Sequence, residues 1–219
     1  MGLSLVKSEE SAKVIYLVAH GDIETDQAVE ICGHPDNDLS EEGFVQAELM
    51  GSWFTDSDVE SIFTSPRTCT ADTADVIAKH VKLPTYFKHS GLTEKKEGEW
   101  EGKTYWEIRD KYSKQWQKWS KDQINFKPEG GESVVDFVAR CGRALKDILT
   151  NYSTGNRMVL VTHKDVVRAM IMNAMNIPVD NFYRLEVLPA SISRVDINDN
   201  YSTLKFMGLS LETANLAAA

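Results

Sequence analysis

The stretch VIYLVAHGDIET (residues 14–25) decides the fold class. Its first six residues are β-branched, aromatic or small and apolar, a composition typical of a short strand buried on both faces of a sheet. The strand ends directly in His20-Gly21, so an imidazole stands at the start of a turn. The residue before it is Ala19, whose side chain carries no functional group. This stretch therefore predicts a buried strand that presents a chemically useful histidine at its carboxyl end.

A second stretch, MVLVTH (158–163), repeats this arrangement late in the chain. It is again a run of apolar, strand-forming residues, and it ends in His163. In an open α/β sheet, ligands bind in the crevice at the carboxyl ends of the strands. Two neighbouring strands of this kind would bring both imidazoles into one pocket. We therefore expect His20 and His163 to belong to one site.

Predicted helices and strands alternate along the rest of the chain. Helical spacing of apolar residues is found over 39–54, 70–81, 133–152 and 166–177, and short strand-like runs over 61–65 and 85–88. The runs FYRLEVLP (182–189) and ISRVDINDNYSTLKFMG (192–208) are typical of edge strands with an Asn-Asp-Asn turn. This alternation predicts a three-layer α/β/α sandwich around a mostly parallel central sheet.

The domain organisation follows from the same pattern. We expect a flexible N-terminus over residues 1–12 and a single domain over 13–219. The segment near 93–127 is polar and rich in tryptophan, which predicts a helical lid or insertion. Its aromatic residues could select an organic substrate, but we expect them to pack the insertion onto the body.

Charge and cysteine content exclude several kinds of partner. The 219 residues carry a net charge of −9 with a pI of about 5.1, which disfavours nucleic acid and anionic membranes because both require a basic surface. The three cysteines are widely spaced and fit neither a disulfide framework nor a zinc-binding motif. No stretch has the length and apolar character of a membrane span. We expect a cytoplasmic protein; the sequence specifies no oligomeric state.

Six short motifs occur in a fixed order along the chain. They are YLVAHGDIE (16–24), DNDLSEEGFVQAELMGSWF (36–54), SIFTSPRTCTADTADVIA (61–78), LTEKKEGEWEG (92–102), GGES (130–133) and VLVTHKDVVRAM (159–170). Over most of the chain this series resembles the histidine phosphatase superfamily, which includes the phosphoglycerate mutases. The resemblance implies a phosphoglycerate mutase-like fold and phosphate-ester chemistry.

The family's catalytic roles can be carried over to three positions. The resemblance implies that His20 is the nucleophile that carries the phosphoryl group, that Glu94 donates a proton to the leaving group, and that His163 hydrogen-bonds the phosphoryl oxygens. Gly21, next to the nucleophile, is expected to contact the substrate. These roles need a neutral imidazole in line with phosphorus and an acid at the leaving oxygen.

The sequence departs from the family pattern at the groups that hold phosphate. The family's arginine before the nucleophile is replaced by Ala19, and counting back four residues from Thr73 places Cys69 at its second pocket arginine. Asp26 stands where the family often has asparagine, and its carboxylate would repel phosphate. Losing one oxyanion donor costs roughly 10²–10³ in rate, and a phosphoryl-clamping arginine can contribute about 10³–10⁵. Two lost arginines would thus remove on the order of 10⁴–10⁶ if their effects add.

Two nearby cations are candidates for binding the substrate instead. Lys164 is adjacent to His163 and could reach the pocket as a point charge, without the bidentate fork of arginine. Arg67 lies two residues from the expected arginine position, so we expect it to point elsewhere. For both residues we favour a solvated surface position.

Three interpretations follow. The first is a divergent histidine phosphatase with weak or no hydrolysis that keeps the His20, Glu94 and His163 pocket for a ligand or a protein partner. The second is an active phosphohydrolase acting through phospho-His20, with Lys164 or Arg67 compensating. The third is a metal site of His20, His163 and Glu94, with Cys69 as a candidate further ligand. The first interpretation is preferred; it needs no cofactor and no metal, and its ligand would be a small phosphorylated or other anionic molecule.

Overall fold

The structure is a computed structural model that describes residues 12–24, 36–152, 155–199 and 201–211. The predicted flexible N-terminus lies outside these residues except for residue 12, and so does Asp26. None of the described helices is both long and apolar enough to cross a membrane.

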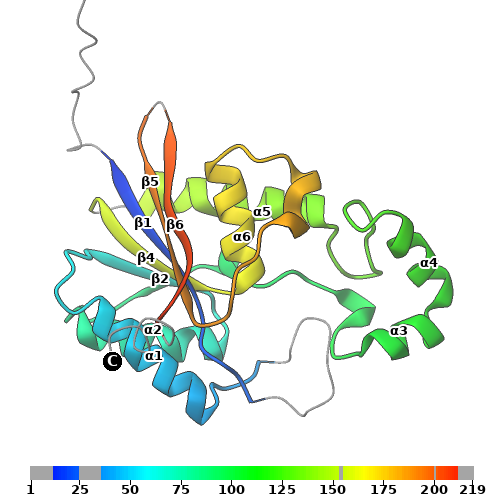
Figure 1. Cartoon of the computed structure of the whole chain (residues 1–219), viewed down its shortest axis with the longest axis horizontal. Coiled ribbons are helices and arrows are strands. Elements are labelled where there is room, and N and C mark those ends of the chain that lie inside the picture. The colour runs from blue at the N-terminus through cyan, green and yellow to red at the C-terminus, as the bar shows by residue number, and fades with distance from the viewer. Residues whose placement is uncertain (1–11, 25–35, 153–154, 200, 212–219) are drawn as a thin grey trace, which may run out of the picture.

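The described strands form one six-stranded sheet in the order β3-β2-β4-β1-β5-β6 (Figure 1). The strands are β1 (Lys13–Ala19), β2 (Ser61–Thr64), β3 (Phe87–Lys88), β4 (Arg157–Thr162), β5 (Ser191–Ile197) and β6 (Ser202–Ser210). The first four strands are parallel, and β5 and β6 are antiparallel to their neighbours. The predicted mostly parallel sheet is therefore confirmed.

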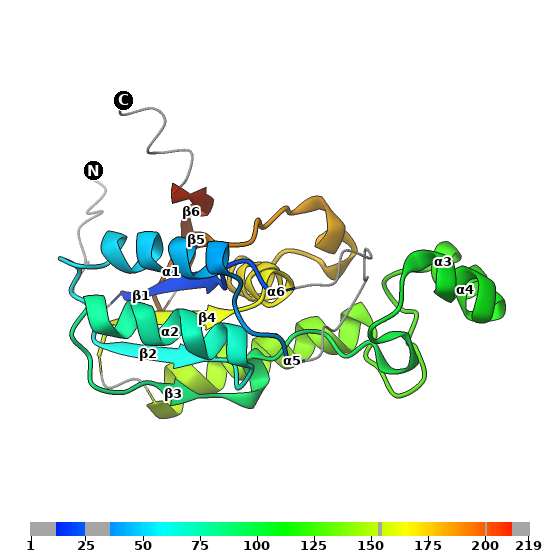
Figure 2. The ribbon, with the colours of Figure 1, turned by 90° about the horizontal axis from the view of Figure 1, so that it is seen from below.

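Helices cover both faces of this sheet, which confirms the three-layer arrangement (Figures 1 and 2). Helices α1 (Glu41–Trp53) and α2 (Thr68–His80) pack on one face, and α5 (Val134–Asp147) and α6 (Lys164–Ala174) pack on the other. Because side chains alternate along a strand, β1 serves both layers: Tyr16 and Val18 join the α1 and α2 side, whereas Ile15 and Leu17 join the α5 and α6 side.

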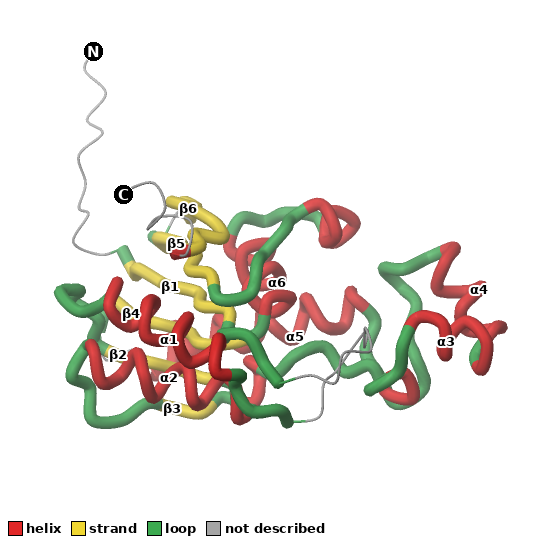
Figure 3. The backbone as a smooth tube through the Cα atoms, turned by 60° about the horizontal axis from the view of Figure 1, so that its bottom comes forward, coloured by secondary structure: helices red, strands yellow, loops and turns green. Residues whose placement is uncertain are grey.

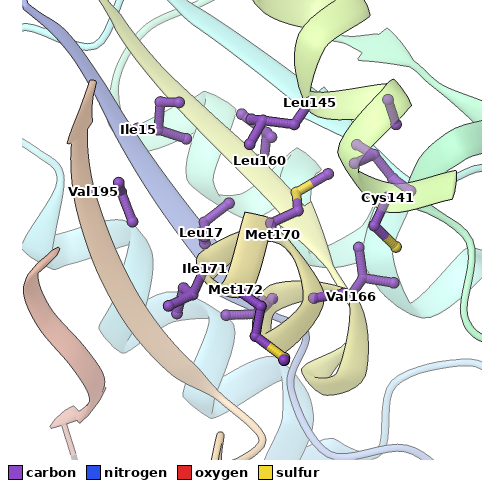
Figure 4. Close-up of a cluster of buried hydrophobic side chains, with 14 of the residues drawn as sticks. Ile15, Leu17, Cys141, Leu145, Leu160, Val166, Met170, Ile171, Met172 and Val195 are labelled. Carbon is purple, nitrogen blue, oxygen red and sulfur yellow. The ribbon is translucent and has the colours of Figure 1, made fainter. Parts of the chain in front are cut away.

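Figure 4 shows the core on the α5 and α6 side, where aliphatic side chains meet methionines of α6 and Cys141 of α5. Ile15 and Leu17 of β1 and Leu160 of β4 point into it. The central strands β1 and β4 are almost wholly buried, as the continuous apolar runs in their sequences predict.

The segment near 93–127 contains α3 (Tyr105–Lys111) and α4 (Ser113–Lys121), which lie apart from the sheet at one end of the molecule (Figures 2 and 3). Its aromatic rings pack against one another: Trp100 stacks on Phe126 with centroids 5.0 Å apart, and Trp116 lies 4.8 Å from Trp119. Trp100 is buried and donates a hydrogen bond to Gln115. The aromatic residues thus form a small core of this segment.

One predicted strand is wrong. The run 182–189 is not part of the sheet; it begins within a 3-10 helix, Val179–Arg184, and continues as a loop. Phe182 is buried in this helix and packs against Phe137 of α5, so its apolar character serves helix packing. Only the hairpin of β5 and β6 forms the antiparallel edge.

A close backbone contact fixes the turn after β1 against α1. A Cβ atom added at Gly43 would lie 2.0 Å from the carbonyl oxygen of Asp22, and one added at Gly21 would lie 2.4 Å from the carbonyl oxygen of Gly43. Both glycines therefore permit an approach that any side chain would block. Ser40 caps α1 and also donates a hydrogen bond to Asp22, so the helix start and the turn are held together.

We predict that Gly43→Ala destabilises the protein by about 1–3 kcal/mol, the usual cost of forcing extra atoms into a packed site. For a chain of this size, that lowers the melting temperature by about 2–4 °C per kcal/mol. Thermal unfolding followed by far-ultraviolet circular dichroism measures the change. Ser52→Ala, on the exposed side of the same helix, is the control and should shift stability by less than about 0.5 kcal/mol. Equal melting of Gly43→Ala and the control would contradict the contact.

Candidate active site

The two strand-end histidines lie side by side. Strands β1 and β4 are parallel neighbours with Ala19 opposite Thr162, and the backbone N–H of His20 donates to the Thr162 carbonyl at 2.9 Å. The rings of His20 and His163 are 5.1 Å apart, centre to centre, at an angle of 77°. The expected shared pocket for these two residues is therefore present.

Hydrogen bonds orient both imidazoles. His20 Nδ1 lies 2.7 Å from the carbonyl oxygen of Gly21. Because a carbonyl oxygen only accepts, Nδ1 carries the proton, and the lone pair of the neutral ring is on Nε2. His163 is buried, and its Nε2 lies 3.1 Å from Ser65 Oγ at the end of β2. The tautomer of His20 is the one that a nucleophilic Nε2 requires.

Glu94 lines the same cleft from the loop that follows Leu92. Burial raises the pKa of its carboxyl group to about 8, and the negative charges of Asp165 and Glu97 add to the increase. The backbone N–H of Lys95, which donates to the carboxylate, and the charge of Lys164 partly offset it. Near neutral pH this group is therefore largely protonated and can donate a proton.

An arginine of α5 holds the loop that carries Glu94. Arg140 donates hydrogen bonds to the carbonyl oxygens of Gly91, Thr93 and Glu94 at 3.0, 3.1 and 3.2 Å. The same guanidinium forms two hydrogen bonds to Glu132, of 2.8 and 2.9 Å. The side chains of Arg140 and Glu132 are only 19% and 15% exposed. This charge pair, shielded from water, fixes the main chain on which the acidic group stands.

The cleft has a volume of about 500 Å³. Its lining includes Ala19, His20, Gly21, Asp22, Asp36, Arg67, Cys69, Glu94, Glu101, His163 and Lys164. The residues that the sequence predicted for the site are thus gathered at one place, apart from Asp26, which lies outside the described residues. None of the aromatic residues of α3 and α4 is among the described residues that line it.

The spacing of Arg67 led us to expect that it points away from the pocket. Arg67 is the residue before α2, it is partly buried, and it lines the cleft. Within the described part of the chain, no hydrogen-bonded or ionic partner is found for its guanidinium group. Lys164, at the start of α6, is exposed at the surface as expected, but it also lines the cleft.

Positions 19 and 69 both contribute neutral side chains to the cleft. Ala19 is 1% exposed and also belongs to the core below α6. Cys69 is 6% exposed, and burial raises the pKa of its thiol to about 12, with Asp36 and Asp72 contributing to the increase. The thiol is therefore uncharged at neutral pH, and neither position offers a cation.

Sequence reasoning missed three residues of the site: Ser65, Glu132 and Arg140. Ser65 belongs to the motif that contains Ser-Pro, but its partner His163 is 98 residues away. Glu132 belongs to GGES, and its partner Arg140 is 8 residues away. A buried arginine on the apolar face of a predicted helix is the signal that could have revealed the pair.

Comparison with known proteins agrees with this geometry. The model of the histidine phosphatase superfamily (branch 1) matches residues 15–210. The adenosylcobalamin/alpha-ribazole phosphatase of Salmonella typhimurium is 23% identical over 193 residues, 88% of this chain and 95% of its own. The metal-independent phosphoserine phosphatase of Arabidopsis thaliana is 29% identical over 169 residues, 76% and 71% of the two chains.

Solved structures show the same fold. The alpha-ribazole phosphatase from Shigella flexneri superposes with a TM-score of 0.81 at 22% identity, covering 90% of this chain and 96% of its own. A mycobacterial glucosyl-3-phosphoglycerate phosphatase in complex with inorganic phosphate gives a TM-score of 0.77, also at 22% identity, and covers 91% and 99%. With the family model matching most of the chain, this protein belongs to the histidine phosphatase superfamily.

Proposed function

We propose that this protein is a divergent histidine phosphatase whose cleft keeps the phosphohistidine machinery but hydrolyses phosphomonoesters only weakly. The observation that carries the proposal is the composition of the cleft. His20, His163 and a protonated Glu94 line it together, while the neighbouring positions 19 and 69 carry a methyl group and a neutral thiol.

The reaction would proceed in two steps. His20 Nε2 attacks phosphorus, the bond to the ester oxygen breaks, and Glu94 gives its proton to that oxygen, which leaves as an alcohol. Water then attacks the phosphorus of phospho-His20, the P–N bond breaks, and the proton of the water passes to Glu94. In both steps His163 would donate a hydrogen bond to a phosphoryl oxygen and so stabilise the transition state.

Weak turnover follows from the charge of the cleft. The equatorial oxygens of a transferring phosphoryl group need fixed positive donors, and each missing donor costs roughly 10²–10³ in rate. Arg67 and Lys164 supply positive charge at the rim, but Asp22, Asp36 and Glu101 line the same cleft with negative charge. The net field is therefore much less favourable to a phosphate dianion than two arginines would make it.

The position of Arg67 favours a second candidate function, an active phosphohydrolase in which this arginine compensates. Arg67 lines the cleft, where its positive charge would favour a phosphate dianion and so a faster reaction. In either case we propose a small organic phosphomonoester or another small anion as the ligand, as the names of the relatives indicate for those proteins. A protein partner is the remaining alternative for a cleft that binds but does not turn over.

The segment near 93–127 enters this proposal as an insertion beside the cleft. It contributes Glu94 and Glu101 to the lining, whereas its aromatic residues pack together elsewhere. We propose that the acid and the entrance of the cleft depend on how this segment is held, which would make it the lid of the site.

Replacing His20 tests its proposed role as the nucleophile. Hydrolysis of an aryl phosphate should be measurable, slow, and lost in His20→Ala, because no phosphohistidine can form. His80→Ala is the matched control: His80 is outside the cleft and contacts Glu48 and Thr55, so its loss should leave the rate within about twofold. Activity that survives His20→Ala after repeated purification would contradict the phosphohistidine route.

The second prediction concerns the pH dependence. Glu94 must be protonated to act as the acid, so kcat/KM should stay level through neutral pH and fall as the pH rises past about 8. Glu94→Gln should reduce kcat/KM by about 10²–10⁴ and abolish that decline. Glu101→Gln removes another carboxyl group of the cleft and should leave the decline of kcat/KM unchanged. A profile that falls near the ordinary pKa of glutamate would contradict the assignment.

The third prediction tests the missing positive charge. Ala19→Arg should increase affinity for inorganic phosphate and the rate of hydrolysis, by roughly 10²-fold if one effective donor is restored. Ala19→Met, of similar length and without charge, separates the effect of charge from that of size. Phosphate titration calorimetry and turnover measure both. A wild-type protein that already turns over like ordinary phosphatases would instead support compensation by Arg67, which Arg67→Gln would then abolish.

A further inference from the structure

Three metal-ligating atoms lie close together among the residues that line the cleft. One ring nitrogen each from His20 and His163 and the sulfur of Cys69 all lie within 4.8 Å of one another. These residues come from the end of β1, the end of β4 and the first turn of α2. Two imidazoles and a thiol, which releases its proton to solvent as the metal binds, form a ligand set that divalent zinc prefers, since it combines nitrogen with soft sulfur.

The distances suit a small ion. With Zn–N of about 2.0–2.1 Å and Zn–S of about 2.3 Å, the donors of a tetrahedral site lie roughly 3.3–3.8 Å apart. The three atoms lie within 4.8 Å of one another, so each pair would have to approach by up to about 1.5 Å for zinc to bind. Side-chain rotation can supply such a shift without moving the strands.

The surroundings of the two rings resemble the outer shell of a metal site. Metal-bound histidines usually present one nitrogen to the ion while the other is held by a protein oxygen. Here the carbonyl oxygen of Gly21 holds His20 Nδ1, and Ser65 Oγ contacts His163 Nε2. Each ring is thus already oriented through one nitrogen.

The local charge also favours a cation. Asp36 and Asp72 act on the Cys69 sulfur as negative neighbours, and Asp22 lines the same cleft. Arg67 and Lys164 also line the cleft and oppose these charges, but positions 19 and 69, beside the histidines, carry no positive charge. Arginines at these two positions would repel a divalent cation, and this chain has Ala19 and Cys69 there instead.

We propose that His20, Cys69 and His163 form a zinc-binding site whose fourth coordination position opens to the cleft. The ligand set differs from the one expected from sequence, because Cys69 takes the place given to Glu94, which is not part of the described cluster. When zinc binds His20 Nε2, that nitrogen cannot attack phosphorus, so zinc and a phosphoryl substrate exclude each other. The site depends on the arrangement of three side chains and does not require hydrolytic activity.

The test is metal titration of the full-length protein after treatment with a chelator. Calorimetry should show one Zn²⁺ bound per chain, and Co²⁺ at the same site should produce the near-ultraviolet absorption of a thiolate–cobalt bond. Cys69→Ala should remove the cobalt band and lower zinc affinity by at least about 10²-fold. Losing a residue that only supports a ligand costs up to about 10²-fold, and losing a ligand itself should cost no less. His163→Ala should lower the affinity similarly.

Cys141→Ala and Cys32→Ala are the matched controls. Cys141 is buried between α5 and α6 and does not line the cleft, so its replacement should retain both the affinity and the band. The proposal is overturned if Cys69→Ala binds zinc as tightly as the wild type, or if the band disappears in Cys32→Ala and persists in Cys69→Ala. Circular dichroism of each variant shows whether a loss of binding reflects unfolding. If zinc binds but aryl phosphate is never hydrolysed, only the proposed function fails.

Discussion

The parallel pairing of β1 with β4 is the constraint on which the site depends. With Ala19 opposite Thr162, the two strands end at the same level, and the next residue of each is a histidine. A slip of one residue would turn every side chain of a strand to the other face, exchanging the partners of Tyr16 and Val18 with those of Ile15 and Leu17. Because both faces are packed by helices, the register is firmly specified, and the positions of the two imidazoles follow from core packing.

The acidic group is placed by a different kind of interaction. Glu94 stands on a loop, where no strand pairing fixes the backbone. Hydrogen bonds from Arg140 to the carbonyl oxygens of Gly91, Thr93 and Glu94 hold it instead. The pairing of Arg140 with Glu132 satisfies the buried charge that this support introduces. Burial of this loop also raises the pKa of Glu94. The sheet thus positions His20, and a loop held by Arg140 positions Glu94.

The sequence was sufficient for the fold and for most of the cleft because both rest on local patterns. Apolar runs predicted the buried strands, and histidines at their ends predicted the shared pocket. The sequence was insufficient where a structural feature depends on the direction of a side chain or on a partner far away in the chain. The run 182–189 has the composition of a strand but begins in a short helix that packs on α5. Arg67 is among the residues that line the cleft, and Arg140 contacts the loop of Glu94 nearly fifty residues earlier in the chain. Composition and spacing do not encode these contacts.

The aromatic cluster beside α3 and α4 has a consequence for spectroscopy. Of the five tryptophans in the chain, Trp100, Trp106, Trp116 and Trp119 belong to this segment, and only Trp53 lies on the sheet-packing helix α1. Intrinsic fluorescence is therefore dominated by a part of the molecule that lies apart from the sheet (Figure 3). An emission change would record loosening or rearrangement of this segment even while the central sheet stays intact. The protein thus carries a built-in optical reporter for the region that supplies its acidic group.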